Sequence, residues 1–280
     1  MSCDLHCHSK LSDGSLDVSE ILALAQCRGL TAISITDHDT IAGANRAVTE
    51  GKHMGVSVIH GVEISAKDYS RNRKVHILGY LCDYPERLEE VCNKTLHSRH
   101  TSAKIMQEKV LERYPIPQNL ITRCASESST IYKQHMMHAL KEAGYVKEFF
   151  GDTFRQLFSS HGGIAYVPIE YPDVRQAIHK IHNAGGIAVL AHPYSYDSID
   201  LMHELVAEGL LDGIEVWHPS NDEQRVSTLS EYADLHNLVK TGGTDFHGMY
   251  TDTPHPIGYR TAPDDVIQQL YEAKDKRFKK

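Results

Sequence analysis

The sequence predicts an α/β fold with a barrel or barrel-like sheet at its centre. Short β-branched runs alternate with helical patterns along the chain, which is typical of consecutive βα units. Histidines and carboxylates also follow several of these runs. The 280 residues, 41% of them hydrophobic, can bury a substantial core. This size fits one large domain or one domain that carries an insertion.

Seven short apolar runs are predicted to be strands, and most are separated by stretches with helical periodicity. The predicted strands are Leu5–His8, Ala32–Thr36, Val56–Ile59, Val75–Tyr80, Ile187–Leu190, Gly213–Trp217 and Leu238–Lys240. The predicted connecting helices include Val18–Arg28, Ala42–Met54 and Val174–Asn183. We therefore expect a mainly parallel sheet.

A different pattern between residues 86 and 164 predicts a helical insertion. Leu88–Arg113 is long and helical, Tyr114–Pro117 breaks the helix, and Ile131–Glu142 is helical again. The predicted domains are therefore a barrel of residues 1–85 and 165–280 and an inserted helical subdomain of residues 86–164. The basic segment Lys274–Lys280 is predicted to be a frayed, solvated tail.

The composition limits the partners and the compartment. A formal net charge of −8 argues against binding of long nucleic acid, which depends on many contacts from Lys and Arg. No apolar run reaches the roughly 20 residues that span a bilayer, so no membrane partner is expected. The first residues lack a basic and apolar leader, and the six cysteines show no metal or disulfide spacing. These features predict a cytoplasmic protein with reduced cysteines.

Histidines and carboxylates are concentrated at the carboxyl ends of the predicted strands, where α/β folds bind ligands. His6 and His8 are two residues apart, so both point to one side of a strand while Cys7 faces away. Asp245 and His247 are expected to behave alike if the chain stays extended. The polar set at strand ends is His6, His8, Asp37, His38, Asp39, Glu63, His192, His218, Asp245 and His247.

This residue set predicts a catalytic metal centre. Imidazole and carboxylate groups suit Zn, Mn or Fe, and a set without thiolate favours a catalytic over a structural site. One isolated pair of histidines on a strand is more often a packing feature, but the joint occurrence favours ligands. The set exceeds the needs of one ion, so we expect two or three divalent metal ions with Glu63 as a bridge.

Several motifs together resemble the PHP (polymerase and histidinol phosphatase) phosphoesterases of the amidohydrolase superfamily. The resemblance implies a distorted seven-stranded β/α barrel (PHP fold) with three metals. It assigns His6, His8, Glu63 and Asp245 to one metal, Asp13, His38 and His247 to another, and Glu63, His76 and His192 to the third. The motifs are Asp4–Ser9, Asp13-Gly14, Thr36–Asp39, Gly61–Glu63, His76–Tyr80, Ala191–Pro193 and Gly243–His247.

Within the family, the chain is similar to small bacterial enzymes that act on nucleoside 3',5'-bisphosphates or RNA 5' ends. Those enzymes often have Arg-x-His at the head of an insertion helix, where this chain has Lys133-Gln134-His135. Lysine offers a charge to phosphate but not the two-pronged geometry of arginine. Lys133 and His135, with Arg73 from a basic loop, are the candidate substrate-binding residues. Solvated surface charge is the alternative for each.

The expected reaction is hydrolysis of a phosphoester in a small phosphorylated metabolite, with a nucleoside 3',5'-bisphosphate or a short oligonucleotide as the first candidate. A metal-bridging hydroxide would attack phosphorus, and no protein nucleophile is needed. Asp39 or His218 is the candidate for proton transfer to the leaving group. The alternatives are that Asp39 orients a metal ligand and that His218 is a turn residue.

Other functions remain open at this level. The substrate could be histidinol phosphate or a cyclic sugar phosphate. A C–N (amide) hydrolase of the same superfamily would use the same activated water, although an amide substrate does not require basic residues beside the site. A non-catalytic or proofreading module is the third alternative, and the complete ligand set argues against it.

Overall fold

The computed structural model describes residues 2–279, and its nine strands form two sheets. The first sheet has the order β3 (Ser57–Val58), β2 (Ala32–Ile35), β1 (Ser2–Cys7) and β9 (Ala262–Pro263). The second has the order β4 (Gly61–Asp68), β5 (Arg73–Tyr80), β6 (Ile187–Leu190), β7 (Gly213–Trp217) and β8 (Val239–Gly242). The predicted α/β class is confirmed.

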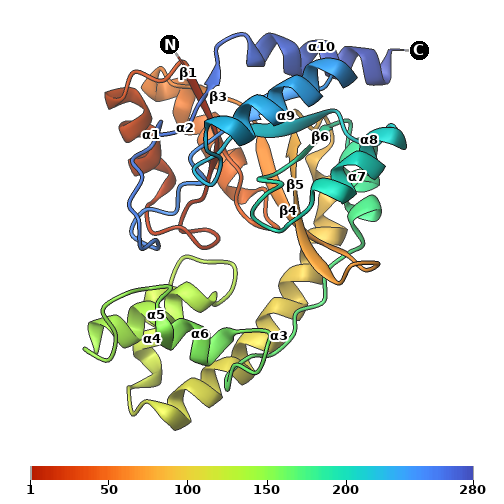
Figure 1. The fold of residues 1–280 in the computed structure, drawn as a ribbon. Helices are drawn as coiled ribbons and strands as arrows, with labels where there is room; N and C mark the ends of the chain where they lie inside the picture. The colour runs from red at the N-terminus through yellow and green to blue at the C-terminus, as the bar shows by residue number, and fades with distance from the viewer. Residues whose placement is uncertain (1, 280) are drawn as a thin grey trace.

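Helices surround the sheets and form a separate lobe (Figure 1). Those near the sheets are α1 (Val18–Cys27), α2 (Ala42–Met54), α7 (Val174–Asn183), α8 (Ile199–Ala207), α9 (Glu223–His236) and α10 (Val266–Phe278). The others are the 3₁₀ helix η1 (Pro85–Leu88), α3 (Glu89–Arg113), α4 (Gln118–Cys124), α5 (Lys133–Glu142) and α6 (Asp152–Phe158). Each helix whose residue range was predicted from the sequence begins and ends within two residues of the corresponding helix in the structure.

Short links join the two sheets at both edges. Cys7 forms an isolated parallel bridge with Phe246, and His38 forms another with Glu63. Tyr80 in the second sheet donates a hydrogen bond of 2.7 Å to the Leu5 carbonyl in the first. Buried residues of both sheets share one hydrophobic cluster. The arrangement is barrel-like and consists of nine strands in two sheets, and the seven-stranded barrel stays a prediction.

Two features of the second sheet differ from the expected parallel order. Strand β5 pairs antiparallel with both β4 and β6, so the sheet is mixed. Strand β4 was not predicted, because Val62 and Ile64 are its only large aliphatic residues and a strand of this kind resembles a loop in sequence. The reversed β5 explains why His76 lies early in its strand. Because β5 runs opposite to both of its neighbours, its amino-terminal part lies beside their carboxyl ends.

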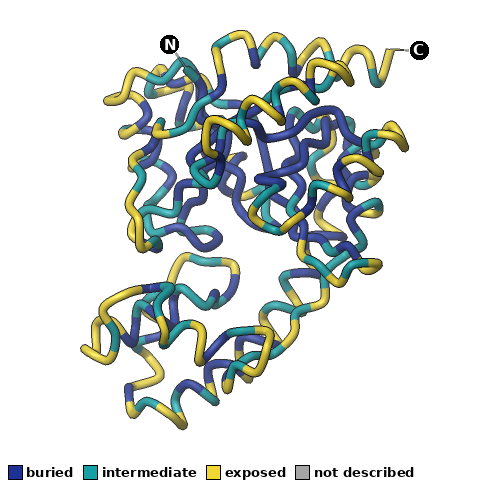
Figure 2. Tube along the Cα trace, in the orientation of Figure 1, coloured by how far each residue is buried: buried dark blue, intermediate teal, exposed yellow. Residues whose placement is uncertain are grey.

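The inserted helices have their own hydrophobic core. Met106 of α3, Ile121 of α4, Met136 of α5 and Leu157 of α6 are buried together in one cluster. Helix α3 runs from the sheets to the lobe made by α4, α5 and α6 (Figure 1), and the lobe contains buried positions of its own (Figure 2). The helical insertion, as named below, means residues 86–164. Its status as a separate domain stays a prediction.

The C-terminal segment is not the frayed tail that the sequence suggested. Most of it belongs to α10, whose Val266 and Leu270 are buried in the cluster shared by the sheets. Lys274 binds the Leu81 carbonyl and the Asp83 carboxylate, at 2.6 Å each. Lys274 was misjudged because its partners lie more than 190 positions earlier in the chain, beyond any local pattern.

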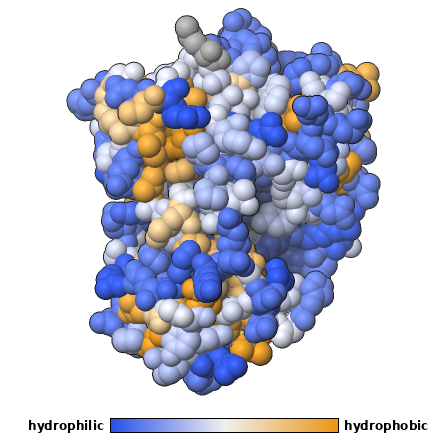
Figure 3. Space-filling view, turned by 60° about the vertical axis from the view of Figure 1, so that its left-hand side comes forward, coloured by the Kyte–Doolittle hydropathy of each residue, from blue (hydrophilic) through white to orange (hydrophobic). Residues whose placement is uncertain are grey.

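Hydrophilic residues predominate on the face drawn in Figure 3, with smaller hydrophobic patches over both the sheets and the helical insertion. Among residues 2–279, no helix combines the length and apolar character needed to cross a membrane. The cytoplasmic location stays a prediction.

The packing of α10 gives a stability test. Leu270 is fully buried, so Leu270→Ala should lower the free energy of unfolding by about 2–5 kcal/mol through lost burial and a cavity. Leu235 is 75% exposed, and Leu235→Ala should change stability by no more than about 0.5 kcal/mol. Urea unfolding of the wild type and of the two variants measures both effects. Equal stability of the two variants would contradict the docking of α10.

Candidate metal centre

Strand β1 places two histidines side by side at the end of the sheet. His6 and His8 are fully buried, and Cys7 between them packs in another cluster with Ile33 and Phe246. This confirms the alternation expected for a strand. The ring centres of His6 and His8 are 5.2 Å apart.

The Glu63 carboxylate lies at the centre of the site and is 1% exposed. Five histidines each place one imidazole nitrogen close to its oxygens, three at Oε2 and two at Oε1. On Oε2 these are His6 at 3.2 Å, His8 at 3.2 Å and His38 at 3.1 Å, and on Oε1 they are His76 at 2.9 Å and His192 at 3.1 Å. No other carboxylate in the described chain has so many imidazole neighbours.

Three groups of side chains bring potential ligand atoms within 4.8 Å of one another. The first group is His6, His8, Glu63 and Asp245, the second is His8, Asp13, His38 and His247, and the third is His38, Glu63 and His76. The first group has the membership that the resemblance implied, and the second adds His8. In the third, His38 takes the place expected for His192, whose ring still lies near Glu63.

Several buried ring nitrogens in these groups and in the neighbouring His192 lack hydrogen-bond partners. They are His6 Nε2, His8 Nδ1 and Nε2, His38 Nδ1, His76 Nδ1 and His192 Nδ1. A buried polar atom without a partner costs free energy. Six such nitrogens at one place therefore require an explanation. Coordination of a cation would satisfy the nitrogen lone pairs, and nitrogen and carboxylate donors suit Zn, Mn or Fe. The residues therefore fit divalent metal ions.

The electrostatics of the site favour several groups in their ligand forms. Burial opposes ionisation of Glu63, but His76 and His38 hold its pKa well below the usual value. Burial lowers the pKa of the His38 ring itself. A neutral imidazole and an ionised carboxylate are the forms that bind metals.

His8 behaves differently in the absence of a metal. Burial opposes its protonation, but Asp245 and Glu63 raise its pKa to about 10. The Nε2 atom that would carry the proton lies 3.2 Å from an oxygen of each carboxylate. A divalent cation would compete with that proton for the same carboxylates and ring.

The last two predicted ligands reach the site by a turn and not by an extended strand. Asp245 has a φ of 49°, in the left-handed region, so the chain bends between Asp245 and His247. The bend sends Asp245 to the first group and His247 to the second. The extended geometry that we expected would have aimed both at one ion. His192 also has a positive φ, of 25°.

Glu215 is a functional residue that the sequence analysis missed. It is fully buried on β7, where its Oε1 lies 2.9 Å from His6 Nδ1 and its Oε2 accepts a hydrogen bond from the His192 backbone. These contacts fix the ring of one candidate ligand and the backbone of another. A lone carboxylate inside the apolar run Gly213–Trp217 was the signal that could have revealed it.

Two further buried carboxylates support the loops that carry ligands. Asp37 accepts hydrogen bonds from Ser9 and Ser12 in the turn before Asp13. Asp4 accepts from Thr244, next to Asp245. Burial raises the pKa of both carboxylates, and their hydrogen-bond donors oppose that rise.

The two candidate proton-transfer residues have different partners. Asp39 accepts a hydrogen bond from the Ser65 backbone at 2.9 Å and is 3.0 Å from Arg99 Nη2. His218 Nε2 lies 3.4 Å from Asp245 Oδ2, and its Nδ1 lies 2.7 Å from Ser220 Oγ. Asp39 therefore has two partners that hold it in place, whereas His218 directly faces a predicted metal ligand. Their catalytic roles stay predictions.

A pocket of about 310 Å³ lies beside the metal groups, between the sheets and the helical insertion. This volume is at the lower end of the range for small-molecule sites, roughly 300–1,000 Å³. Its walls combine predicted ligands, cations and aromatic rings. They include Asp13, His38, His76, Lys74, Arg99, Lys133, Tyr132, Phe150, Phe154, Tyr171 and Tyr196.

The three predicted substrate-binding residues have different positions. Lys133 lines the pocket, and burial, with Lys74 and Arg99 nearby, lowers its pKa to about 7. His135 lines a neighbouring cavity, and its Nδ1 accepts a hydrogen bond from the Tyr132 backbone. Arg73 pairs with the Asp197 carboxylate at 2.6 Å. Their binding roles stay predictions.

Arg99 is a second residue that the sequence analysis did not select. It projects from α3 into the pocket, where its Nη2 lies 3.0 Å from Asp39 and 3.1 Å from Ser65 Oγ. Its guanidinium carbon is 4.7 Å from the centre of the Tyr132 ring. In the sequence it is one of several basic residues on a long polar helix, which conceals its position.

Comparison with known proteins identifies the family. The PHP domain matches residues 4–188. A phosphoribosyl 1,2-cyclic phosphate 1,2-diphosphodiesterase from Eggerthella lenta is 39% identical over 259 residues, which cover 92% of this chain and 98% of the relative. A 5'-3' exoribonuclease from Haemophilus influenzae is 32% identical, with 87% of this chain and 89% of that protein covered.

A solved structure extends the comparison to the whole fold. It comes from Bifidobacterium adolescentis and carries the name of a metal-dependent phosphoesterase. It superposes with a TM-score of 0.86 at 28% identity and covers 97% of this chain and 96% of its own. The comparisons confirm the predicted class of enzyme, a hydrolase of phosphoric esters. The chain belongs to the PHP domain family.

Proposed function

We propose that the protein hydrolyses a phosphoester in a small ribosyl phosphate, with a cyclic ribose phosphate as the first candidate. The observation that carries the proposal is one pocket in which predicted metal ligands face Lys74, Arg99 and Lys133. Cations beside a metal centre match an anionic phosphoester and have no role with a neutral amide. The first candidate is favoured by the relative that acts on a phosphoribosyl cyclic phosphate and is 39% identical.

A second candidate substrate is a nucleoside 3',5'-bisphosphate or the 5' end of a short RNA, which the sequence analysis had placed first. The aromatic side chains of the pocket favour it, because bases stack on aromatic rings. Tyr132, Phe150 and Phe154 all line the pocket. The exoribonuclease among the relatives also supports this candidate.

The centre is proposed to hold two or three ions of Mn, Fe or Zn in a distorted seven-stranded barrel. The seven strands of four or more residues would form its wall, since β3 and β9 have only two residues each. Ions at the three ligand groups would supply an activated water and neutralise charge on the phosphate oxygens. The donor set does not discriminate among these metals.

The protein side chains have distinct tasks in this proposal. Arg99 and Lys133 bind and orient the phosphate from the side of the helical insertion. The surrounding aromatic rings exclude water from the pocket, which strengthens these charge interactions. His218 is the proposed proton donor to the leaving oxygen, since its Nε2 already faces Asp245 at 3.4 Å. Asp39 is the proposed positioning residue for Arg99.

A substrate panel tests the function. The protein is supplied with Mn, its bound metals are counted, and phosphate or ester release is followed from four compounds. They are a cyclic ribose phosphate, adenosine 3',5'-bisphosphate, histidinol phosphate and AMP. We expect the highest kcat/KM for the cyclic phosphate and loss of activity when a chelator removes the metal. Preference for the bisphosphate would support the second candidate, and no turnover of any compound would contradict both.

Glu215→Gln tests how the centre is supported. Loss of the charge next to His6 Nδ1 should weaken metal affinity about 10- to 100-fold, as is common for residues that orient a ligand. Metal titration followed by elemental analysis measures this effect, and far-ultraviolet circular dichroism checks the fold. Glu231→Gln, a change on the exposed face of α9, is the matched control. Unchanged affinity in Glu215→Gln would remove the proposed role.

Lys133 predicts a pH dependence of substrate binding. A lysine with a pKa of about 7 is charged below that pH and neutral above it, so affinity should fall as the pH rises through 7. A cyclic phosphodiester serves as the probe because it does not titrate in this range. Lys133→Ala should raise KM about 10- to 100-fold at low pH, the range for loss of a charged hydrogen bond.

The control variants separate charge from packing. Lys133→Arg keeps its charge at all these pH values, so its KM should vary little with pH. Lys147→Ala removes an exposed lysine of the same helical insertion and should behave as wild type. A pH profile of KM that is identical in wild type and Lys133→Arg would show that Lys133 does not contact the phosphate.

A further inference from the structure

A fourth group of potential metal ligands lies in the helical insertion, apart from the three groups around Glu63 and Asp13. Cys124 at the end of α4 and His138 and Glu142 on α5 bring one ligand atom each within 4.8 Å of one another. His138 and Glu142 are four residues apart on a helix and so share one face. His138 Nε2 and Glu142 Oε1 are 3.2 Å apart.

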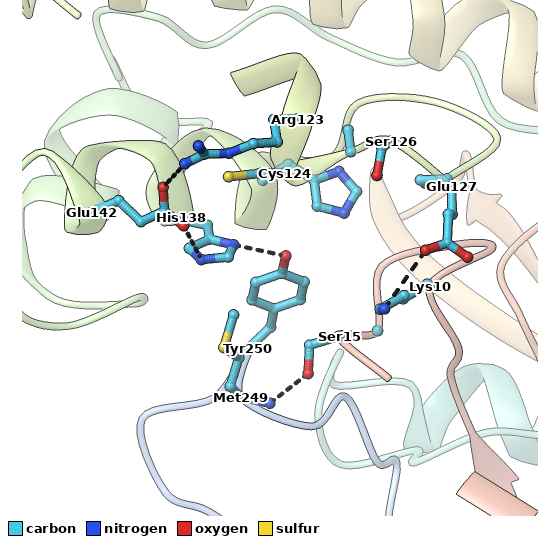
Figure 4. A pocket seen from close by; sticks show the side chains of 14 residues that line it. Lys10, Ser15, Arg123, Cys124, Ser126, Glu127, His138, Glu142, Met249 and Tyr250 are labelled. Atoms are coloured by element: carbon cyan, nitrogen blue, oxygen red, sulfur yellow. Dashed lines mark hydrogen bonds and ion pairs between the residues drawn. The ribbon is translucent and has the colours of Figure 1, made fainter. Parts of the chain in front are cut away.

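The surroundings orient each of these side chains. The Tyr250 hydroxyl lies 3.1 Å from His138 Nδ1, which leaves Nε2 directed at Glu142. Arg123 pairs with the other carboxylate oxygen of Glu142, so Oε1 remains available. Figure 4 shows the Cys124 sulfur between Arg123 and His138, directed at the same place. A hydrogen bond to the second ring nitrogen is typical of a metal-binding histidine.

All three side chains line a cavity of about 260 Å³ that also contains Tyr250 and Ser126 (Figure 4). The cavity gives a fourth coordination position access to water. A thiolate, an imidazole and a carboxylate form a donor set that suits Zn²⁺ in tetrahedral geometry. The catalytic groups contain no thiolate, so the two places differ in chemistry.

We propose that Cys124, His138 and Glu142 form a zinc site separate from the catalytic centre. The ion would cross-link α4 to α5 and hold His138 against Tyr250, which follows the ligand His247 by three residues. The site would therefore brace the helical insertion against the loop after β8. A His–Glu helix pair with an unrelated cysteine is the alternative that the experiment must exclude.

Cobalt substitution provides a direct spectroscopic test. The full-length protein is stripped of metal and titrated with Co²⁺, which gives a near-ultraviolet charge-transfer band only when a thiolate is a ligand. We expect such a band in the wild type, its loss on addition of Zn²⁺, and its absence from Cys124→Ser. Cys27→Ser, which changes an exposed free cysteine, should retain the band. His138→Gln and Glu142→Gln should each weaken Co²⁺ binding at this site.

Two outcomes of the cobalt titration would overturn the proposal. One is the absence of a thiolate band in the wild type, and the other is a band that persists in Cys124→Ser. Alkylation of Cys124, read by mass spectrometry, gives an independent measurement in the unmodified protein. Zn²⁺ should slow modification of Cys124 and leave that of Cys27 unchanged, and equal rates with and without Zn²⁺ would contradict the site. Neither readout depends on phosphoesterase activity, so failure of the zinc-site proposal would leave the proposed function intact.

Discussion

Burial of the Glu63 carboxylate among five imidazole rings is the constraint on which the rest of the structure depends. Removal of an ionised carboxylate from water is costly unless opposite charge or hydrogen bonds compensate for it. The rings lie within 3.2 Å of its oxygens, yet several ring nitrogens have no hydrogen bond. Cations among these groups would satisfy the carboxylate and the ring nitrogens together. The centre is therefore well suited to divalent ions.

Such a centre requires a rigid surround, and further buried carboxylates provide it. Asp4, Asp37 and Glu215 each bind the backbone or side chains of segments that carry ligands. They connect elements far apart in the chain, such as Thr244 with Asp4 near the start. These contacts would hold the strand ends in place even when the centre contains a proton, or carboxylates that repel one another, instead of metal ions. Precise positioning of ligands is what limits most metal sites.

The sequence could bring the candidate ligands together because strand geometry is local. A strand end and a spacing of two residues place His6 and His8 without knowledge of the fold. Long-range effects could not be read in the same way. The direction of β5, the carboxylate of Glu215 and the position of Arg99 all depend on neighbours that only tertiary packing brings together. His76 was found through the family resemblance, since its strand runs opposite to the others.

The charge balance of the centre connects the metals to the choice of substrate. The predicted ligands include three carboxylates, Asp13, Glu63 and Asp245, and the histidines bind metals as neutral rings. Two divalent ions would leave one net positive charge, and three ions would leave three. Lys74, Arg99 and Lys133 add to that charge on the side of the pocket. A protein with a formal net charge of −8 would thus concentrate positive charge at one place, where it would attract an anionic phosphoester.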